Sequence, residues 1–258
     1  MNENKNYLKN YDLVSEDVKF AVNSVIRLKI LAALFEKPQN MKELATNTKL
    51  GYSSISNILH GLELKDFAYR KSNKYYLANS LRVQMRNVLD LNEIIHILNK
   101  FFSIIDGHTV DMIPDQSVLE LHLIENADLL ESDGIDAYKI LDFIEGSLEN
   151  AKWVQCILPF YHLNVNKKLN SLIKNGRFVE VMASKEVFEI YEKKSNIKYL
   201  SSFNGRNNFL LIVTDKVMIL GFFKENGYFD QNRLLTCEDD EAIKWAEDLF
   251  KNFKNRNK

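Results

Sequence analysis

Apolar residues recur at three- and four-residue intervals near the start of the chain, a spacing that predicts helices. The first such stretch is residues 16–36, and Pro38 ends it because the residue before a proline disfavours helical backbone angles. Asn40 then precedes a new apolar run, and Glu43 follows three residues later, which is the signature of a capping box. The pattern therefore predicts a long helix followed by a short one.

A third helix is predicted after a turn. Ser53 or Ser54 is a suitable N-cap for it, and its pattern runs to about Lys65. The apolar residues of this helix fall on a single stripe, as expected for one buried face: Ile55, Ile58, Leu59 and Leu62. The opposite face is therefore predicted to be polar and exposed.

Residues 67–77 alternate between aromatic and polar positions around a Ser72-Asn73 centre, which predicts a β-hairpin. The order of elements over residues 16–79 is thus helix, short helix, turn, helix and hairpin. This order is typical of a winged helix-turn-helix domain, in which the third helix enters the DNA major groove and the hairpin forms the wing.

Residues 80–105 predict a connector helix. Its apolar positions are spaced close to a heptad repeat: Leu81, Met85, Val88, Leu91, Ile95, Leu98, Phe102 and Ile105. Two interpretations remain open for this seam. It pairs with the same helix of a second chain in a homodimer, or it packs against its own domain.

From residue 106 onward, helical patterns alternate with short apolar runs. Helices are predicted at residues 117–131, 136–150, 166–174, 185–194 and 238–253. Strands are predicted at residues 153–159, 177–183, 197–201, 209–214 and 217–223. The alternation predicts an α/β domain with a mixed sheet over residues 106–258. The chain as a whole is therefore expected to be of the α+β or α/β class, with the winged helix, the connector helix and this domain in order.

Charge distinguishes the two halves of the chain. The net charge is −1, yet residues 1–105 carry 15 Lys and Arg against 10 Asp and Glu, and residues 24–79 carry 9 against 4. The overall composition, 46% hydrophobic and 27% charged, is that of an ordinary globular protein. A basic N-terminal module predicts a polyanionic partner, and double-stranded DNA is the partner that a winged helix favours.

The candidate DNA contacts come from three segments. The short polar residues of the third helix suit base edges and phosphates, and Asn57 is able to pair with adenine. The wing offers cations for the backbone or the minor groove, and the start of the second helix favours a phosphate. The candidates are Asn40, Lys42, Ser53, Ser54, Ser56, Asn57, His60, Arg70, Lys71 and Lys74. The alternative is a winged helix that makes protein contacts through the same polar face.

Catalytic and metal motifs are absent from the sequence of the C-terminal half. It has no glycine-rich phosphate loop and no Gly-x-Ser-x-Gly. Two groups have weak metal-ligand character: Asp106 and His108 with Asp111, and His122 with Glu125. For the helical pair His122 and Glu125, a surface contact is the simpler interpretation. We therefore expect no enzyme activity, no cofactor and no metal. The alternative is an α/β enzyme acting on a small phosphorylated substrate.

The setting is expected to be cytoplasmic. No apolar run reaches the length of a membrane span, and residues 1–10 are polar without the apolar core of a signal peptide. The chain has 2 cysteines, too few for a disulfide framework. Cys156 lies in an apolar run and is expected to be buried, whereas Cys237 lies in a polar stretch and is expected to be more exposed.

The N-terminal motif resembles archaeal winged-helix regulators of the broad ArsR/MarR kind. The residues that carry this resemblance are Ile26–Leu31, Leu44-Ala45, Ser53, Ile55, Ser56, Leu59, Leu62, Tyr69–Lys71 and Tyr76-Leu77. One position departs from the pattern, because Asp66 stands where such domains usually have glycine after the recognition helix.

The C-terminal half resembles the C-terminal domain of methanogen transcriptional regulators of the filamentation or methanogenesis-regulatory type. The residues concerned are Asp106, His108, Ile113-Pro114, 153–159, Val213–Asp215, Leu220-Gly221, Asn226-Gly227, Asp230, Ala242, Trp245, Leu249 and Phe250. Phospholipase D-like sensor domains of archaeal regulators are similar, but the catalytic His-x-Lys of that fold is not kept, since His162 is followed by Leu163-Asn164.

These resemblances imply an archaeal homodimeric regulator that binds double-stranded DNA and carries a C-terminal domain for an effector or a partner. A protein-interaction scaffold built on the winged helix is a further alternative, which the acidic C-terminal half favours. An unknown small-molecule effector is the expected ligand.

Overall fold

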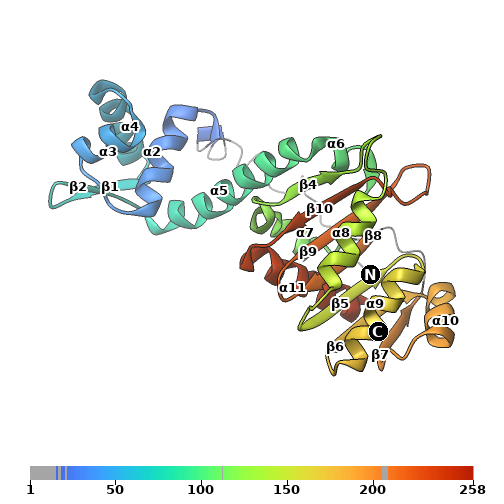
Figure 1. Cartoon of the computed structure of the whole chain (residues 1–258). Coiled ribbons are helices and arrows are strands. Elements are labelled where there is room, and N and C mark those ends of the chain that lie inside the picture. The colour runs from blue at the N-terminus through green and yellow to red at the C-terminus, as the bar shows by residue number, and fades with distance from the viewer. Residues whose placement is uncertain (1–15, 17–18, 21, 112, 205–208, 258) are drawn as a thin grey trace. The chain divides into compact units, whose positions relative to one another are not determined.

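The computed structural model describes residues 16, 19–20, 22–111, 113–204 and 209–257 (Figure 1). The chain divides into two compact units, residues 1–92 and 93–258. The boundary falls within the longest helix, α5 (Asn79–Lys100). The units are described separately below.

The first unit is a winged helix-turn-helix, as the sequence predicts. Its further elements are α2 (Val25–Glu36), α3 (Met41–Thr48), α4 (Tyr52–Leu64), β1 (Ala68–Lys71) and β2 (Lys74–Leu77). The apolar stripes of its helices meet in one core, which includes Ile30, Leu31, Leu34, Leu44, Ile55, Leu59 and Leu62. Burial of these residues holds α4 against α2 and α3 and leaves its polar face outward.

Two helix starts differ from the sequence-based expectation. The helix predicted from residue 16 is interrupted at Ser24, which has an extended backbone and whose Oγ accepts a hydrogen bond from the Arg27 N–H at 3.3 Å, so that α2 begins at Val25. The prediction that Ser53 or Ser54 caps the third helix is wrong. Gly51 is the N-cap, and its carbonyl accepts from the Ile55 N–H at 3.1 Å. Both serines therefore lie in the first turn of α4.

The wing is the predicted hairpin. β1 and β2 pair antiparallel, with Arg70 opposite Tyr75. Ser72 and Asn73 have φ angles of 48° and 62°, the left-handed conformation that a two-residue hairpin turn requires. Asp66 has a φ angle of 55°, so it adopts the left-handed conformation for which glycine is usual at this position.

The second unit is an α/β domain with a mixed sheet, as predicted. Its helices are α6 (Phe102–Ile105), α7 (Asp115–Leu119), η1 (Leu121–Ile124), α8 (Lys139–Leu148), α9 (Leu163–Lys174), α10 (Lys185–Lys194) and α11 (Asp240–Arg256). Its strands are β3 (His108–Thr109), β4 (Asp128–Glu131), β5 (Trp153–Leu158), β6 (Phe178–Ser184), β7 (Tyr199–Phe203), β8 (Phe209–Thr214), β9 (Met218–Lys224) and β10 (Arg233–Cys237).

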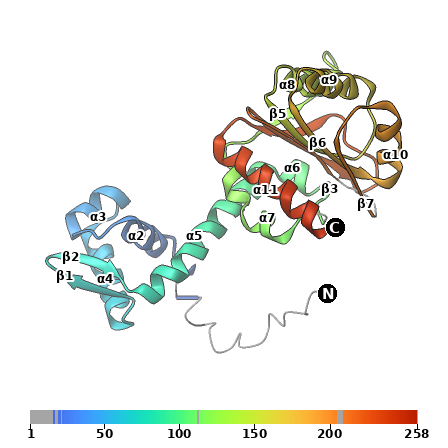
Figure 2. The same ribbon diagram turned by 90° about the horizontal axis from the view of Figure 1, so that it is seen from below.

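The strand order is β4-β10-β9-β8-β5-β6-β7, with β3 paired to β9. Strands β5, β6 and β7 are parallel, and the other pairs are antiparallel. Helices α8 and α9 cover one face of this sheet and α11 covers the other (Figure 2). Each face has its own apolar core, one around Val154, Leu169 and Ile212, the other around Leu211, Trp245 and Phe250.

The region around residues 117–131 corrects the sequence-based prediction. A single helix was expected there, but the chain forms α7, then the short 3-10 helix η1, and then the edge strand β4. Leu130 of β4 pairs with Leu234 of β10, a strand that the sequence analysis did not predict. Because β10 also buries Cys237, which is 6% exposed, the expectation of a more exposed Cys237 is wrong as well.

The apolar seam of residues 80–105 divides in two. Leu81 and Met85 are buried in the core of the first unit. Further along α5 and into α6, four seam residues are exposed: Leu91, Ile95, Leu98 and Phe102. The seam therefore packs partly on its own domain, and its second half presents apolar side chains to solvent. Within the described residues, none of the helices combines the length and apolar character needed to cross a membrane.

Candidate nucleic-acid interface

Helix α4 presents a polar face to solvent. Ile55, Leu59 and Leu62 are buried, and this fixes the rotation of the helix about its axis. The residues on its exposed side are Ser53, Ser56, Asn57 and His60, and Ser54 is half-buried. Their side chains are short and uncharged or weakly basic, which suits hydrogen bonds to base edges and phosphates.

The wing adds exposed cations. Arg70, Lys71 and Lys74 are all exposed on the hairpin. Arg70 Nη2 donates to Asn73 Oδ1 at 2.6 Å, which holds the guanidinium near the hairpin turn. Lys74 Nζ lies 4.0 Å from a Glu43 carboxylate oxygen, at the limit of an ion pair, so most of the wing's positive charge is left uncompensated.

The wing is fixed to the start of α3 by Gln39. The Gln39 N–H donates to the Tyr75 carbonyl at 3.3 Å, and the Tyr75 N–H donates back at 2.8 Å. The buried Gln39 side chain makes two hydrogen bonds: its Nε2 donates to the Ala33 carbonyl at 2.6 Å, and its Oε1 accepts from Asn47 at 2.7 Å. These hydrogen bonds connect the hairpin to the start of the second helix.

The start of α3 carries the predicted capping box. Asn40 Oδ1 accepts from the Glu43 N–H at 2.9 Å, and Glu43 Oε2 accepts from the Asn40 N–H at 2.7 Å. Lys42 is exposed beside it. Asn40 thus orders the helix end that presents Lys42, in addition to offering its own amide group.

Two aromatic features of this surface were not predicted from the sequence. Tyr52, at the first position of α4, is 56% exposed. On the wing, Tyr69 and Tyr76 stack with ring centroids 5.4 Å apart. The hairpin register could have indicated the tyrosine pair, because opposite positions of a hairpin place their side chains on one face.

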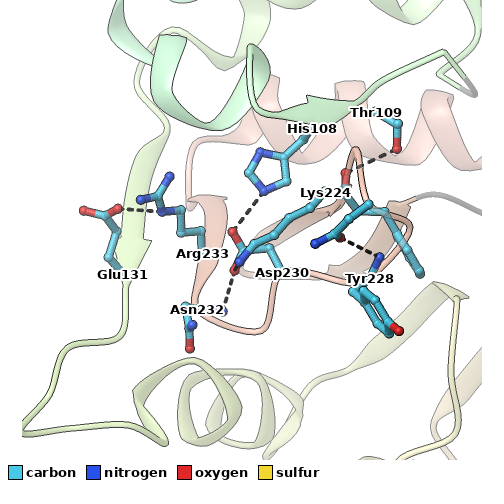
Figure 3. A network of polar contacts seen from close by, with 10 residues as sticks. His108, Thr109, Glu131, Lys224, Tyr228, Asp230, Asn232 and Arg233 are labelled. Atoms are coloured by element: carbon cyan, nitrogen blue, oxygen red, sulfur yellow. Dashed lines mark hydrogen bonds and ion pairs between the residues drawn. The ribbon is translucent and has the colours of Figure 1, made fainter.

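The second unit contains a buried polar cluster, shown in Figure 3. His108 Nε2 and Asp230 Oδ2 are 2.9 Å apart, and both side chains are 3% exposed. Asp230 Oδ1 also accepts from the Asn232 N–H at 3.0 Å and lies 3.5 Å from Lys224 Nζ. Burial raises the pKa of Asp230, but these donors outweigh it and hold the pKa below its ordinary value.

A pocket of about 860 Å³ adjoins this cluster, lined by both acidic and basic residues that include Glu131 and Arg233, themselves paired at 3.0 Å. His108 and Asp230 are two of the residues that carry the resemblance in the C-terminal half, and the fold brings them together.

In the same unit, ligand atoms of Glu93 and His122 lie within 4.8 Å of each other. Burial raises the pKa of the Cys156 thiol, which makes it unreactive.

The fold and these surfaces define a class: a winged helix-turn-helix domain followed by an α/β domain with a mixed sheet. Residues 137–256 match the family model of the middle domain of the methanogenesis regulatory protein FilR1. The resemblance to methanogen regulators of this type is thereby confirmed for the C-terminal part of the chain.

Among curated proteins, the methanogenesis regulatory protein FilR1 of Methanothrix harundinacea (strain 6Ac) is 20% identical to this chain. The match covers 59% of this chain and 37% of that protein. The chain therefore spans little more than a third of the relative's length.

Two solved structures are similar to this chain at low identity. TrmBL2, described as an archaeal chromatin protein with a novel mode of DNA binding, is 13% identical with a TM-score of 0.40, covering 96% of this chain and 97% of TrmBL2. Nuc, a phospholipase D family member from Salmonella typhimurium, is 14% identical with a TM-score of 0.39, covering 50% of this chain and 92% of Nuc.

Proposed function

We propose that this protein is a transcriptional regulator that binds double-stranded DNA through its winged helix. The observation that carries the proposal is the outward polar face of α4 beside an exposed basic wing. The match to a family of regulatory proteins supports it. The unit of residues 93–258 then senses a small molecule or a partner.

Each candidate residue has a role in this proposal. Asn57 reads adenine in the major groove, and His60 contacts a base edge or a phosphate. Ser53, Ser54 and Ser56 contact the phosphate backbone. Arg70 enters the minor groove, where its planar cation is favoured, while Lys71 and Lys74 contact phosphates. Asn40 and Lys42 bind a phosphate at the start of α3. No Lys or Arg projects from the exposed centre of α4 (residues 53–60). Phosphate contacts therefore supply much of the affinity.

The protein acts as a homodimer in this proposal. The exposed residues Leu91, Ile95, Leu98 and Phe102 step by alternating four- and three-residue intervals, the spacing of a coiled-coil seam. A second copy of the same helix is the occupant that matches this spacing. Two-fold symmetry then predicts a DNA site of two half-sites, separated by about one helical turn or a multiple of it.

Salt dependence of DNA binding tests the wing assignment. For the full-length protein and a random duplex, the affinity should fall as salt rises. The double variant Arg70→Glu with Lys71→Glu should bind all sequences more weakly and reduce the salt slope by about 2. The matched control is Lys185→Glu with Lys193→Glu, two exposed lysines of α10 in the second unit, which should leave the slope unchanged. An unchanged slope in the wing variant would contradict the proposal.

A further inference from the structure

An apolar pocket of about 460 Å³ lies in the unit of residues 93–258. Its lining is mainly apolar, unlike that of the charged pocket beside His108. Its walls come from α8, α9, α10 and the sheet, and they include Ile140, Ile144, Leu158, Val165, Leu210 and Ile212. Leu158 is the last residue of β5, which runs parallel to β6. Ligands of α/β domains bind near the carboxyl ends of such strands, and this volume lies in the range of small-molecule sites.

Two polar atoms of residues that line this pocket lack partners among the described residues. They are Tyr191 Oη and His162 Nδ1, and both atoms are buried. The Tyr191 side chain has no exposed surface. Burial raises the pKa of its phenol, an effect that the nearby His162 main-chain N–H offsets only in part. Buried polar groups of native proteins almost always have a hydrogen-bond partner, so an unpartnered hydroxyl facing a cavity indicates that a ligand group supplies one.

The packing around Tyr191 shows that this residue is held in place without its hydroxyl. Its ring meets that of Tyr161 edge-on, with centroids 5.1 Å apart, and Phe160 meets Phe229 at 4.9 Å. All four rings line the pocket. The aromatic wall therefore holds the Tyr191 ring in place, while its hydroxyl hydrogen can rotate toward an acceptor on a ligand.

The chemistry of the walls selects the kind of ligand. Within the part of the chain that the structure describes, no Lys, Arg, Asp or Glu lines this pocket. A charged ligand would lose its hydration here without gaining a counter-ion, which is strongly unfavourable. An apolar ligand with one carbonyl or hydroxyl group would instead bury its hydrocarbon part and bond to Tyr191.

We propose that this pocket binds an uncharged, mainly apolar small molecule through a hydrogen bond to the Tyr191 hydroxyl. This ligand is the effector in the sensing role proposed above, so its effect on regulation rests on the proposed function. Binding of the ligand to the pocket does not. Ligand binding is measured without DNA, so a failure of ligand binding is distinguishable from a failure of DNA binding.

The experiment titrates the full-length protein with benzylacetone, with phenylbutanol and with γ-phenylbutyrate at about pH 7, using methyl-group NMR spectra to locate binding. The ketone and the alcohol should bind saturably and shift methyl signals of the pocket. The carboxylate, with a similar hydrocarbon part, should bind at least about tenfold more weakly. Absence of saturable binding for both uncharged probes would overturn the proposal, as would equal binding of the carboxylate.

Two variants test whether the ligand binds in this pocket. Tyr191→Phe should weaken benzylacetone binding about threefold to tenfold, as expected for one lost hydrogen bond. Ala137→Trp adds a large side chain at an exposed position that lines the pocket, and it should abolish binding without disturbing the core. Tyr199→Phe, on an exposed tyrosine outside the pocket, is the matched control and should bind like the unmodified chain. Unchanged binding in either Tyr191→Phe or Ala137→Trp would overturn the proposal.

A stability measurement separates ligand recognition from a structural role. Because Tyr191 Oη donates a hydrogen bond to none of the described residues, Tyr191→Phe should melt at close to the same temperature as the unmodified chain. A clear fall in the melting temperature of Tyr191→Phe without ligand would show that the hydroxyl has a structural partner, and that would overturn the proposal.

Discussion

Asp230 accepts a hydrogen bond from His108 Nε2 at 2.9 Å, although 122 positions separate the two residues in the sequence. The pair connects the short strand β3 to the segment between β9 and β10, and neither side chain is appreciably exposed. Because it is buried and supported by Asn232 and Lys224, it contributes to the stability of the second unit and gives that stability a dependence on pH.

The pH dependence follows from the direction of the Asp230 pKa. The pKa is lower in the folded protein than its ordinary value of 3.8, so the contribution is complete above about 4 and is lost as pH falls through the folded value. Asp230→Asn should reduce the free energy of unfolding by about 2 kcal/mol at neutral pH and flatten its acid dependence. Asp248→Asn removes a more exposed carboxylate and should change the free energy of unfolding by less than about 0.5 kcal/mol. Urea unfolding at several pH values measures both, and equal effects of the two variants would contradict the prediction.

Stability of the first unit should depend on the capping box. Asn40→Ala removes the acceptor of the Glu43 N–H and should destabilise the winged helix by about 1 kcal/mol. Asn87→Ala, in the exposed interior of α5, is the control and should be neutral or slightly stabilising because alanine favours a helix. Hydrogen exchange of α3 amides measures the difference. Equal protection in the two variants would show that the cap has no energetic role.

Sequence readout should depend on Asn57. Its replacement by alanine should relax the preference at one base pair of each half-site, at a cost of about 1 to 3 kcal/mol for the preferred base, while phosphate contacts persist. Selection from a random duplex library, compared between the unmodified chain and Asn57→Ala, measures the preference. Thr46→Ala, on the exposed surface of α3, should leave the selected sequence unchanged. An identical selected sequence for Asn57→Ala would remove this residue from base readout.

Oligomeric state should depend on the exposed half of the α5 seam. Ile95→Glu with Leu98→Glu places charges on this stripe and should convert a dimer to a monomer, because a coiled-coil seam does not accommodate two carboxylates. Val83→Glu changes a more exposed apolar residue of α5, 70% exposed and off the seam, and should leave the dimer intact. Sedimentation velocity distinguishes these outcomes. A monomeric unmodified chain, or a dimer that survives the double variant, would refute the proposed interface.

The sequence predicts elements well where the signals are local. The wing is an example, because Ser72 and Asn73 are suited to the left-handed turn that they form. The capping box of Asn40 and Glu43 likewise identifies the start of α3. These features depend on residues a few positions apart, which a periodic pattern and turn chemistry describe fully.

Elements that depend on distant partners are not predictable in this way. The sequence pattern predicts a helix over residues 117–131, which places β4 at its end. β4 becomes a strand by pairing with β10, about a hundred residues later in the chain. Burial of Cys237 follows from the same pairing. The cavity that Tyr191 lines was also beyond the sequence pattern, since its walls come from α8, α9, α10, the sheet and the segment after β9.

The central claim is that the winged helix binds specific DNA. Fluorescence anisotropy tests it most directly, with the full-length protein, its own upstream DNA and a random duplex of equal length at two salt concentrations. The account predicts tighter binding to the upstream DNA, a fall in affinity as salt rises, and weaker binding of the Arg70→Glu, Lys71→Glu variant to both duplexes. Absence of binding to either duplex at low salt would contradict the account, and protein interaction through the winged helix would take its place.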